Sequence, residues 1–153
     1  MTQRIVVGVD ASPPSVDALR RAAEEARWRE APLEVVYVFS PPEPVAAWPV
    51  LPEHGSDQAD IEGERRKAHE RLEAWLKEVD ADLSGVEVTS AVVADKKPSR
   101  VLVERSGDAE LIVVGSRGRG GFAGLRLGSV SEQVTRHALC PVLVVREHER
   151  TQK

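Results

Sequence analysis

A glycine-rich stretch with three arginines could bind an anion. The sequence GSRGRGGFAGLRLGS covers residues 115–129 and follows the apolar run LIVV. Glycine lets the backbone approach a ligand, so that main-chain N–H groups can reach phosphate oxygens. Arg117, Arg119 and Arg126 could add charge-assisted hydrogen bonds, and the stretch contains no Asp or Glu to repel an anion. We interpret it as a phosphate-binding loop; the alternative is a flexible surface connection whose arginines keep it soluble.

A helix is predicted to begin where this stretch ends. The segment from Ser129 to about Leu139 is closed by Pro141 and has helical character. The first turn of a helix carries unpaired N–H groups and a partial positive charge, which both favour a bound phosphate. Ser129 is expected to be the N-cap of this helix as well as a phosphate contact.

Asp10 is the second residue that could contact a ligand. It follows the apolar run IVVGV and precedes Ser12, Pro13 and Pro14. Its carboxylate could bind a ligand or Mg²⁺, or it could complement the first turn of the helix that follows. We favour the ligand or Mg²⁺ role.

The remaining reactive side chains indicate no catalytic or metal site. No metal-ligand spacing relates the histidines to one another or to Cys140, which we interpret as a small buried hydrophobic residue. Trp28 and Trp75 lie in helical segments and are expected to pack against the core. Trp48 could cover a bound base or simply pack down. The histidines are His54, His69, His137 and His148.

Length and composition favour one globular domain. A chain of 153 residues can bury a core without disulfides, and its single cysteine has no partner within the chain. The net charge of −4 argues against nucleic-acid binding. Because no apolar run approaches the length of a membrane span and the N-terminus shows no export signal, we expect a cytoplasmic protein without membrane contact.

Short apolar runs alternate with helical patterns along the chain. The runs are β-branched and nearly continuous, which is typical of strands buried on both faces of a parallel sheet. Helical spacing joins Val16 to Ala26 and Ile61 to Val79, and shorter helices fit residues 98–106 and 129–139. The order β-α-β-α-β-α-β-α-β predicts an α/β fold with helices on both faces of the sheet. The predicted strands are 5–9, 33–39, 86–93, 111–115 and 142–145.

Two further segments have a distinctive composition. Residues 40–57 contain five prolines and no periodicity, so we predict a long loop there. Residues 63–73 carry opposite charges three and four positions apart, which is typical of the solvated face of a helix.

The glycine spacing resembles that of a known family. Gly115, Gly118, Gly128 and Ser129 form the pattern G-x2-G-x9-G-S. Together with the opening VVGVDAS and the run GSVSEQVTRHALCPVLVV, this pattern resembles the ATP-binding branch of the universal stress protein family. The resemblance covers residues 1–153 as a single domain. It implies a Rossmann-like, adenine nucleotide alpha hydrolase-like three-layer α/β/α sandwich with a five-stranded parallel sheet in the order 3-2-1-4-5.

The resemblance also implies a site for ATP, with Mg²⁺. Asp10 would lie near the ribose and phosphates, and Val38 beside adenine. The glycine pattern with Arg117 would hold the triphosphate, and backbone and hydroxyl donors of Val130 and Ser131 could reach it. One departure is ADKKPS at residues 94–99, where many relatives carry glycine, so the rim of the pocket is expected to differ there.

These features favour a nucleotide-dependent regulatory module in the stress response over an enzyme. The sequence has no Walker lysine, no well-placed general base and no nucleophile beside a histidine, which leaves at most slow ATP hydrolysis. A nucleotide-free, partner-binding protein of the same fold is the main alternative. An NAD- or FMN-dependent oxidoreductase is less favoured, because the G-x-G-x-x-A formed by Gly118, Gly120 and Ala123 has only one strand after it.

The last strand is expected to lie at a sheet edge. In the implied strand order, the run VLVV would expose unpaired backbone groups. We therefore predict a homodimer that pairs through residues 141–146, in agreement with what the resemblance implies.

Overall fold

Strands and helices alternate along the whole described chain. The computed structural model describes residues 3–41, 58–117 and 127–147, which form five strands and four helices. The predicted α/β alternation is therefore confirmed. In chain order the elements are β1 (Arg4–Val9), α1 (Pro13–Arg29), β2 (Leu33–Phe39), α2 (Gln58–Glu78), β3 (Val88–Ala94), α3 (Pro98–Arg105), β4 (Ala109–Gly115), α4 (Ser129–His137) and β5 (Val142–Val145).

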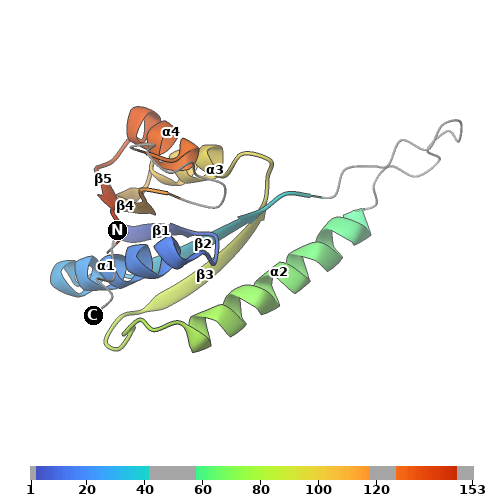
Figure 1. Ribbon diagram of the computed structural model, residues 1–153, viewed down its shortest axis with the longest axis horizontal. Helices are drawn as coiled ribbons and strands as arrows, with labels where there is room; N and C mark the ends of the chain where they lie inside the picture. Colours follow the sequence, from blue (N-terminus) through green and yellow to red (C-terminus); the bar gives the residue numbers. More distant parts are fainter. Residues whose placement is uncertain (1–2, 42–57, 118–126, 148–153) are drawn as a thin grey trace, which may run out of the picture.

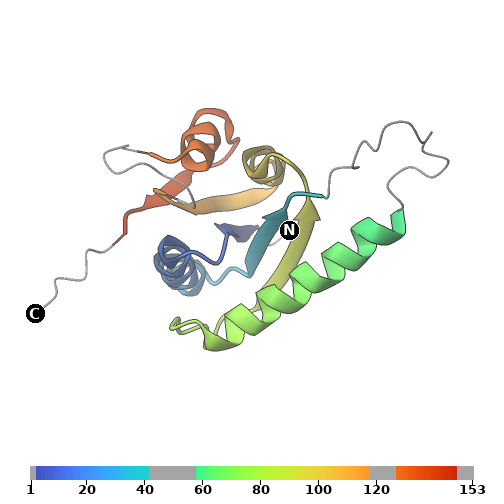
Figure 2. The same cartoon turned by 45° about the vertical axis from the view of Figure 1, so that its right-hand side comes forward.

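The strands form one parallel sheet between two helical layers. Their order is β3-β2-β1-β4-β5, which confirms the predicted topology. Helices α1 and α2 cover one face of the sheet, and α3 and α4 cover the other (Figures 1 and 2). Each strand-helix-strand connection carries the chain back to the same edge, so the carboxyl ends of all five strands lie together.

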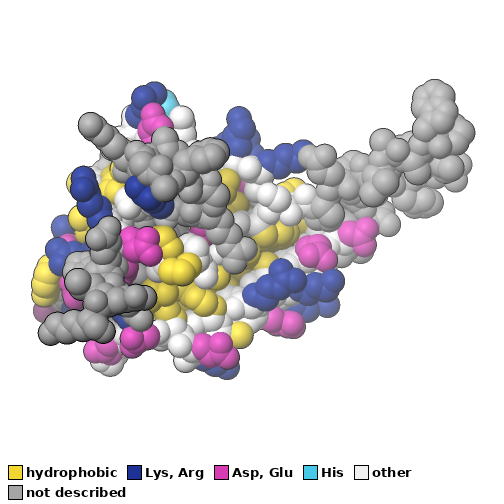
Figure 3. All heavy atoms as spheres, viewed as in Figure 1, with side chains coloured by type: hydrophobic (Ala, Val, Ile, Leu, Met, Phe, Trp, Pro, Cys, Tyr) yellow, Lys and Arg dark blue, Asp and Glu magenta, His cyan; other side chains and the backbone are white. Residues whose placement is uncertain are grey.

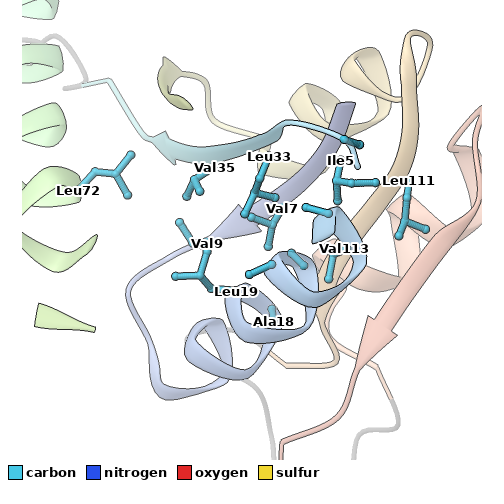
Figure 4. Close-up of a cluster of buried hydrophobic side chains, with 14 of the residues drawn as sticks. Ile5, Val7, Val9, Ala18, Leu19, Leu33, Val35, Leu72, Leu111 and Val113 are labelled. Carbon is cyan, nitrogen blue, oxygen red and sulfur yellow. The ribbon is translucent and has the colours of Figure 1, made fainter. Parts of the chain in front are cut away.

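Alternate residues of the central strands fill two separate cores. Val7 and Val113 pack toward α1 and α2 (Figure 4), whereas Val6 and Ile112 pack toward α3 and α4, and all four are fully buried. This double burial explains why the central strands are apolar without alternation. On α1 the buried face consists largely of alanines, which let the helix lie close to the sheet.

The two helical tryptophans differ in burial. Trp75 is half-buried and packs against the core beneath α1 and α2, as predicted. The expectation that Trp28 packs against the core is wrong, because 67% of its surface is exposed. Trp28 follows the buried Ala26 by two residues. Two residues of a helix turn the side-chain direction by about 200°, which points Trp28 toward solvent. There the Trp28 ring lies beneath the Arg21 guanidinium, 5.0 Å from its central carbon.

The charged face of α2 is as predicted. Ion pairs join Lys67 to Glu64 at 3.1 Å and Arg65 to Glu62 at 3.5 Å, each three residues apart. Lys and Arg side chains gather over α2 with Asp and Glu side chains beside them (Figure 3). Within the described parts of the chain, no helix combines the length and apolar character that crossing a membrane requires.

Gly8 in β1 provides the space into which α3 packs. A Cβ atom at position 8 would lie 2.8 Å from Leu102 Cδ1, and Leu102 is itself buried. We predict that Gly8→Ala lowers the free energy of unfolding by about 1–3 kcal/mol, because the core is overpacked. Urea denaturation measures the change.

Two comparisons make this prediction specific. Gly63→Ala, in α2 where nothing lies within 4 Å of the new Cβ, should instead stabilise the fold by about 0.5–1 kcal/mol. In a Leu102→Ala background the Gly8→Ala change should cost less, because the clashing atom is gone. An equal cost in both backgrounds would contradict the proposed contact.

Candidate functional site

The strand order reverses between β1 and β4, which are neighbours in the sheet. From β1 the chain continues through α1 to β2 on one side, and from β4 it continues through α4 to β5 on the other. Such a reversal opens a crevice beyond the carboxyl ends of the two strands, where open α/β sheets bind ligands. The pairing of Val7 with Val113 makes Val9 level with Gly115. Asp10 and Ser116, one residue further on, therefore flank this crevice.

The Asp10 carboxylate orders the turn from β1 into α1. Its Oδ1 atom accepts hydrogen bonds from the Ser12 N–H at 3.0 Å, from the Ser15 hydroxyl at 2.7 Å and from the Ser12 hydroxyl. The Ser15 oxygen in turn accepts the Asp10 N–H at 2.9 Å. Within this turn Ala11 has a φ of 61°, in the left-handed region that non-glycine residues rarely adopt. Asp10 thus complements the start of α1, and its ligand role stays a prediction.

Gly115 allows β4 to end close to the start of α1. A Cβ atom there would lie 3.3 Å from the Arg117 carbonyl oxygen and 3.4 Å from the Pro14 carbonyl oxygen. Both neighbours are backbone atoms, which cannot turn aside as a side chain can. Two main-chain segments are therefore in close contact beside the strand reversal.

The backbone of Ser116 anchors the beginning of α4. Its carbonyl oxygen accepts the Gly128 N–H at 2.6 Å, and its N–H donates to the Val145 carbonyl at 2.8 Å. The Ser131 hydroxyl donates to the carbonyls of Ser116 and Gly128, at 3.2 and 3.0 Å. These contacts hold the two ends of the glycine-rich stretch together.

The predicted cap of α4 is shifted by one residue. The expectation that Ser129 is the N-cap is wrong: Gly128 occupies that position with φ −73° and ψ 165°, and no side chain caps the helix there. The Gly128 N–H bond to Ser116 fixes the extended geometry before the helix, which makes exposed Ser129 the first helical residue. By helix geometry, the N–H groups of the first turn have no intrahelical partner. Glu132, the acidic residue in that turn, pairs with Arg136 at 2.9 Å.

Val38 lies near the same edge, at the end of β2. The pairing of Val9 with Tyr37 makes Asp10 level with Val38. Val38 is half-buried beside Val93 on the face that α3 and α4 cover. Half-buried Arg117, one residue beyond Ser116, lies at the β4 side of the crevice.

The segment ADKKPS, residues 94–99, forms a hydrogen-bonded turn before α3. Asp95 Oδ1 accepts the Lys97 N–H at 2.8 Å, and Oδ2 accepts hydrogen bonds from Nε and Nη2 of the Arg100 guanidinium. The hydrogen bond from Arg100, followed by that from the Lys97 backbone, lowers the pKa of Asp95. Asp95 is thus engaged by its own turn, whereas Lys96 and Lys97 leave this rim with basic character.

Some predicted site residues lie outside the described chain. Gly118, Arg119 and Arg126 belong to the undescribed residues 118–126, as do Gly120 and Ala123 of the dinucleotide-like pattern. Most of the predicted loop, residues 42–57 with Trp48 and His54, is likewise outside it, and so is His148.

Residues 3–41, 58–117 and 127–147 contain no group of three His, Cys, Asp or Glu side chains that could hold a metal ion.

Burial raises the pKa of Cys140, and its thiol lies 3.4 Å from the Pro141 carbonyl oxygen. A half-buried neutral thiol fits the predicted packing role better than that of a nucleophile.

A cavity of about 550 Å³ lies at the opposite edge of the sheet, lined by residues of the α1–β2 connection and of the segment before β3. Its basic residue, Arg27, donates to the carbonyl oxygens of Ser84 and Asp82. Since this guanidinium already fastens one connection to α1, we assign the cavity no ligand.

Three serines of the site were missed from the sequence. Ser12 and Ser15 hold the Asp10 carboxylate, and Ser116 anchors α4. The sequence did contain a signal for Ser12 and Ser15. They follow Asp10 by two and five residues, with two prolines between them, and this pattern is typical of a turn into a helix. Ser116 acts through its backbone, so its side-chain type carried no signal.

Comparison with known proteins gives a consistent relationship. The sequence profile described as the Universal stress protein family matches residues 1–146. Universal stress protein Rv2623 of Mycobacterium tuberculosis is 40% identical over 143 residues, which cover 94% of this chain and 45% of that protein. The chain therefore spans about half the length of the curated relatives it matches.

Solved structures of similar proteins contain adenine nucleotides. A universal stress protein in complex with cAMP is 29% identical, with a TM-score of 0.59 over 95% of this chain and 98% of that one. The universal stress protein from Archaeoglobus fulgidus in complex with dAMP is 28% identical, with a TM-score of 0.57 over 94% and 98%.

Ser15→Ala tests the turn at Asp10. The change removes one donor to the carboxylate and the acceptor of the Asp10 N–H, so we predict a loss of about 1–2 kcal/mol in the free energy of unfolding. Chemical denaturation measures it. Ser84→Ala removes a similar Ser–Asp contact, to Asp82 in an exposed turn, and should cost less. Equal effects of the two changes would contradict the assigned role of the Asp10 turn.

Proposed function

We propose that this chain, which belongs to the Universal stress protein family, binds ATP at the carboxyl edge of its sheet and acts as a nucleotide-dependent regulatory module. The observation that carries the proposal is the anchoring of α4. Hydrogen bonds to Ser116 hold the amino end of this helix beside the strand reversal. Its unpaired N–H groups there meet the requirement for phosphate binding.

Glycine at both ends of the stretch supports a ligand held by backbone. A Cβ atom at position 115 would lie only 3.3 Å from a main-chain carbonyl oxygen, and position 128 adds no side chain to the start of α4. In the proposed complex the amides of Ser129 and Val130 donate to phosphate oxygens, as would those around Gly118. Arg117 contributes positive charge, with Arg119 and Arg126 of the same stretch adding to it.

The adenosine end of the ligand is assigned to the β1 and β2 side of the crevice. Val38 would contact adenine, and Asp10 would face the ribose and phosphates. Relatives solved with cAMP and dAMP support an adenine nucleotide as the ligand class. We propose that Mg²⁺ accompanies the triphosphate. The Asp10 carboxylate would face the ion from the β1 side.

The proposed role is binding and signalling, with at most slow hydrolysis. The sequence has no Walker lysine, and the function needs no base or nucleophile at the crevice. The regulatory output and the cytoplasmic location stay predictions.

The nucleotide released from purified protein on denaturation distinguishes the candidate functions. ATP or ADP in nearly equimolar amount supports the proposal, whereas NAD or FMN would favour an oxidoreductase. Protein that releases no nucleotide and shows no thermal shift with added ATP would favour the nucleotide-free, partner-binding alternative.

Gly128→Val should block the phosphate end of the site. Because φ −73° and ψ 165° are open to any residue, valine adds bulk rather than backbone strain. We predict that ATP affinity falls at least about tenfold, the equivalent of roughly 1.4 kcal/mol. Isothermal titration calorimetry measures it. Gly107→Val, at the amino edge of the sheet, is the control and should leave the affinity unchanged; unaltered binding by the Gly128 variant would refute the site.

We also propose a homodimer that pairs through β5. This strand hydrogen-bonds only to β4 within the described residues, and all four of its side chains are half-exposed. Pro141 and Val145 direct their carbonyls toward β4, so by alternation the N–H and C=O groups of Val142 and Val144 face the open edge. A second copy in antiparallel orientation would satisfy these groups on both chains.

Val144→Pro tests this pairing without disrupting the β4–β5 ladder. Proline removes an N–H that faces the open edge, and edge strands tolerate it there. We predict that the dissociation constant of the dimer rises at least about tenfold, because two symmetry-related hydrogen bonds are lost. Sedimentation equilibrium measures this. Val144→Thr keeps the backbone donor and should remain dimeric, and a parent protein that is monomeric at micromolar concentration would refute the dimer.

A further inference from the structure

We infer that Ser131 is a positioning residue: its buried hydroxyl fastens the amino end of α4 to the end of β4 and so aims the first-turn amides at the ligand. The inference rests on the proposed nucleotide site. It differs from the expectation, implied by the family resemblance, that this hydroxyl itself reaches the phosphates.

The side chain of Ser131 faces the protein interior. The residue is 1% exposed, and its Oγ lies 3.2 Å from the Ser116 carbonyl oxygen and 3.0 Å from that of Gly128. A hydroxyl has one proton, which these two acceptors share. In this geometry the hydroxyl serves the backbone at both ends of the glycine-rich stretch, and it offers no donor to a ligand.

The hydrogen bond from the Ser131 hydroxyl to the Ser116 carbonyl connects two distant segments of the chain. Serine in the first turn of a helix often bonds the carbonyl three residues earlier, and the contact with Gly128 is of that kind. The contact with Ser116 instead spans fifteen residues of sequence and joins α4 to the strand β4. Without it, only the Gly128 N–H would tie the Ser116 carbonyl to the helix.

Ser116 is itself fixed on its other side. Its N–H donates to the carbonyl of Val145 at the end of β5, so the Ser116 backbone is held between the edge strand and α4. Val134, one turn after Val130 and fully buried, anchors the rest of α4 against the sheet. The position of the first turn is therefore set by the Ser116 carbonyl and by the Ser131 side chain that bonds it.

Loss of the Ser131 hydroxyl should weaken the phosphate end of the ligand selectively. The amides of the first turn would no longer be held in one direction, whereas the adenosine end, at β1 and β2, has no contact with Ser131. A merely structural defect would weaken all ligands alike. The ratio of ATP to adenosine affinity therefore separates a positioning role from general destabilisation.

The experiment compares Ser131→Ala with Thr135→Val in the full chain. Thr135 Oγ1 donates to the Ser131 carbonyl at 2.6 Å, so its replacement removes a hydroxyl contact on the same helix without touching Ser116. For Ser131→Ala we expect ATP affinity to fall about three- to tenfold, the value of one hydrogen bond, with adenosine affinity unchanged. Thr135→Val should bind both as the parent does.

A second measurement needs no nucleotide. Amide hydrogen exchange at Gly128, followed by NMR in the free protein, should be faster in Ser131→Ala than in the parent and unchanged in Thr135→Val. Parental ATP affinity in Ser131→Ala, or an equal loss of ATP and adenosine, would overturn the inference. If the parent binds no nucleotide, the proposed function fails; faster exchange at Gly128 would then still support the fastening, and unchanged exchange would overturn it too.

Discussion

The main-chain N–H and C=O groups of Ser116 join β4, β5 and α4 at the carboxyl edge of the sheet. Its N–H reaches Val145 at the end of β5, and its carbonyl receives the Gly128 N–H and the Ser131 hydroxyl from α4. Buried main-chain N–H and C=O groups must find hydrogen-bond partners. For Ser116 these partners come from the edge strand and from the following helix, so this one residue fixes where α4 starts relative to the sheet.

The opposite wall of the crevice depends on a similar arrangement. Asp10 holds Ser12 and Ser15, which directs the chain from β1 into α1 through the left-handed Ala11. The carbonyl of Pro14 then approaches Gly115, where a Cβ atom would lie 3.4 Å from it and 3.3 Å from the Arg117 carbonyl oxygen. Both walls are backbone segments held by short polar side chains. This construction suits a ligand that is recognised through main-chain donors.

The amino edge of the sheet is built differently. Glu34 in β2 pairs with Arg105 of α3 at 2.6 Å and with Arg4 of β1 at 3.4 Å, while Arg20 and Arg27 of α1 bond the connection between α2 and β3. Long charged side chains thus close this edge around the helix ends. The exposed pairs among them, such as Arg20–Asp80, contribute little stability individually. Their effect is to occupy the amino edge, which leaves the carboxyl edge with glycines and helix amino ends.

The sequence by itself determined the elements, because each is set by periodicity and by local signals. Continuous β-branched runs located the strands, and Pro98 and Pro141 marked helix boundaries; the glycine spacing indicated a phosphate-type loop. The strand order came from the family resemblance, since alternation alone does not fix it. The tertiary structure alone decided contacts between distant segments. Local patterns could not locate the Ser116 anchor, the inward turn of Ser131, the shift of the α4 cap to Gly128 or the exposure of Trp28, because each depends on what packs beside it.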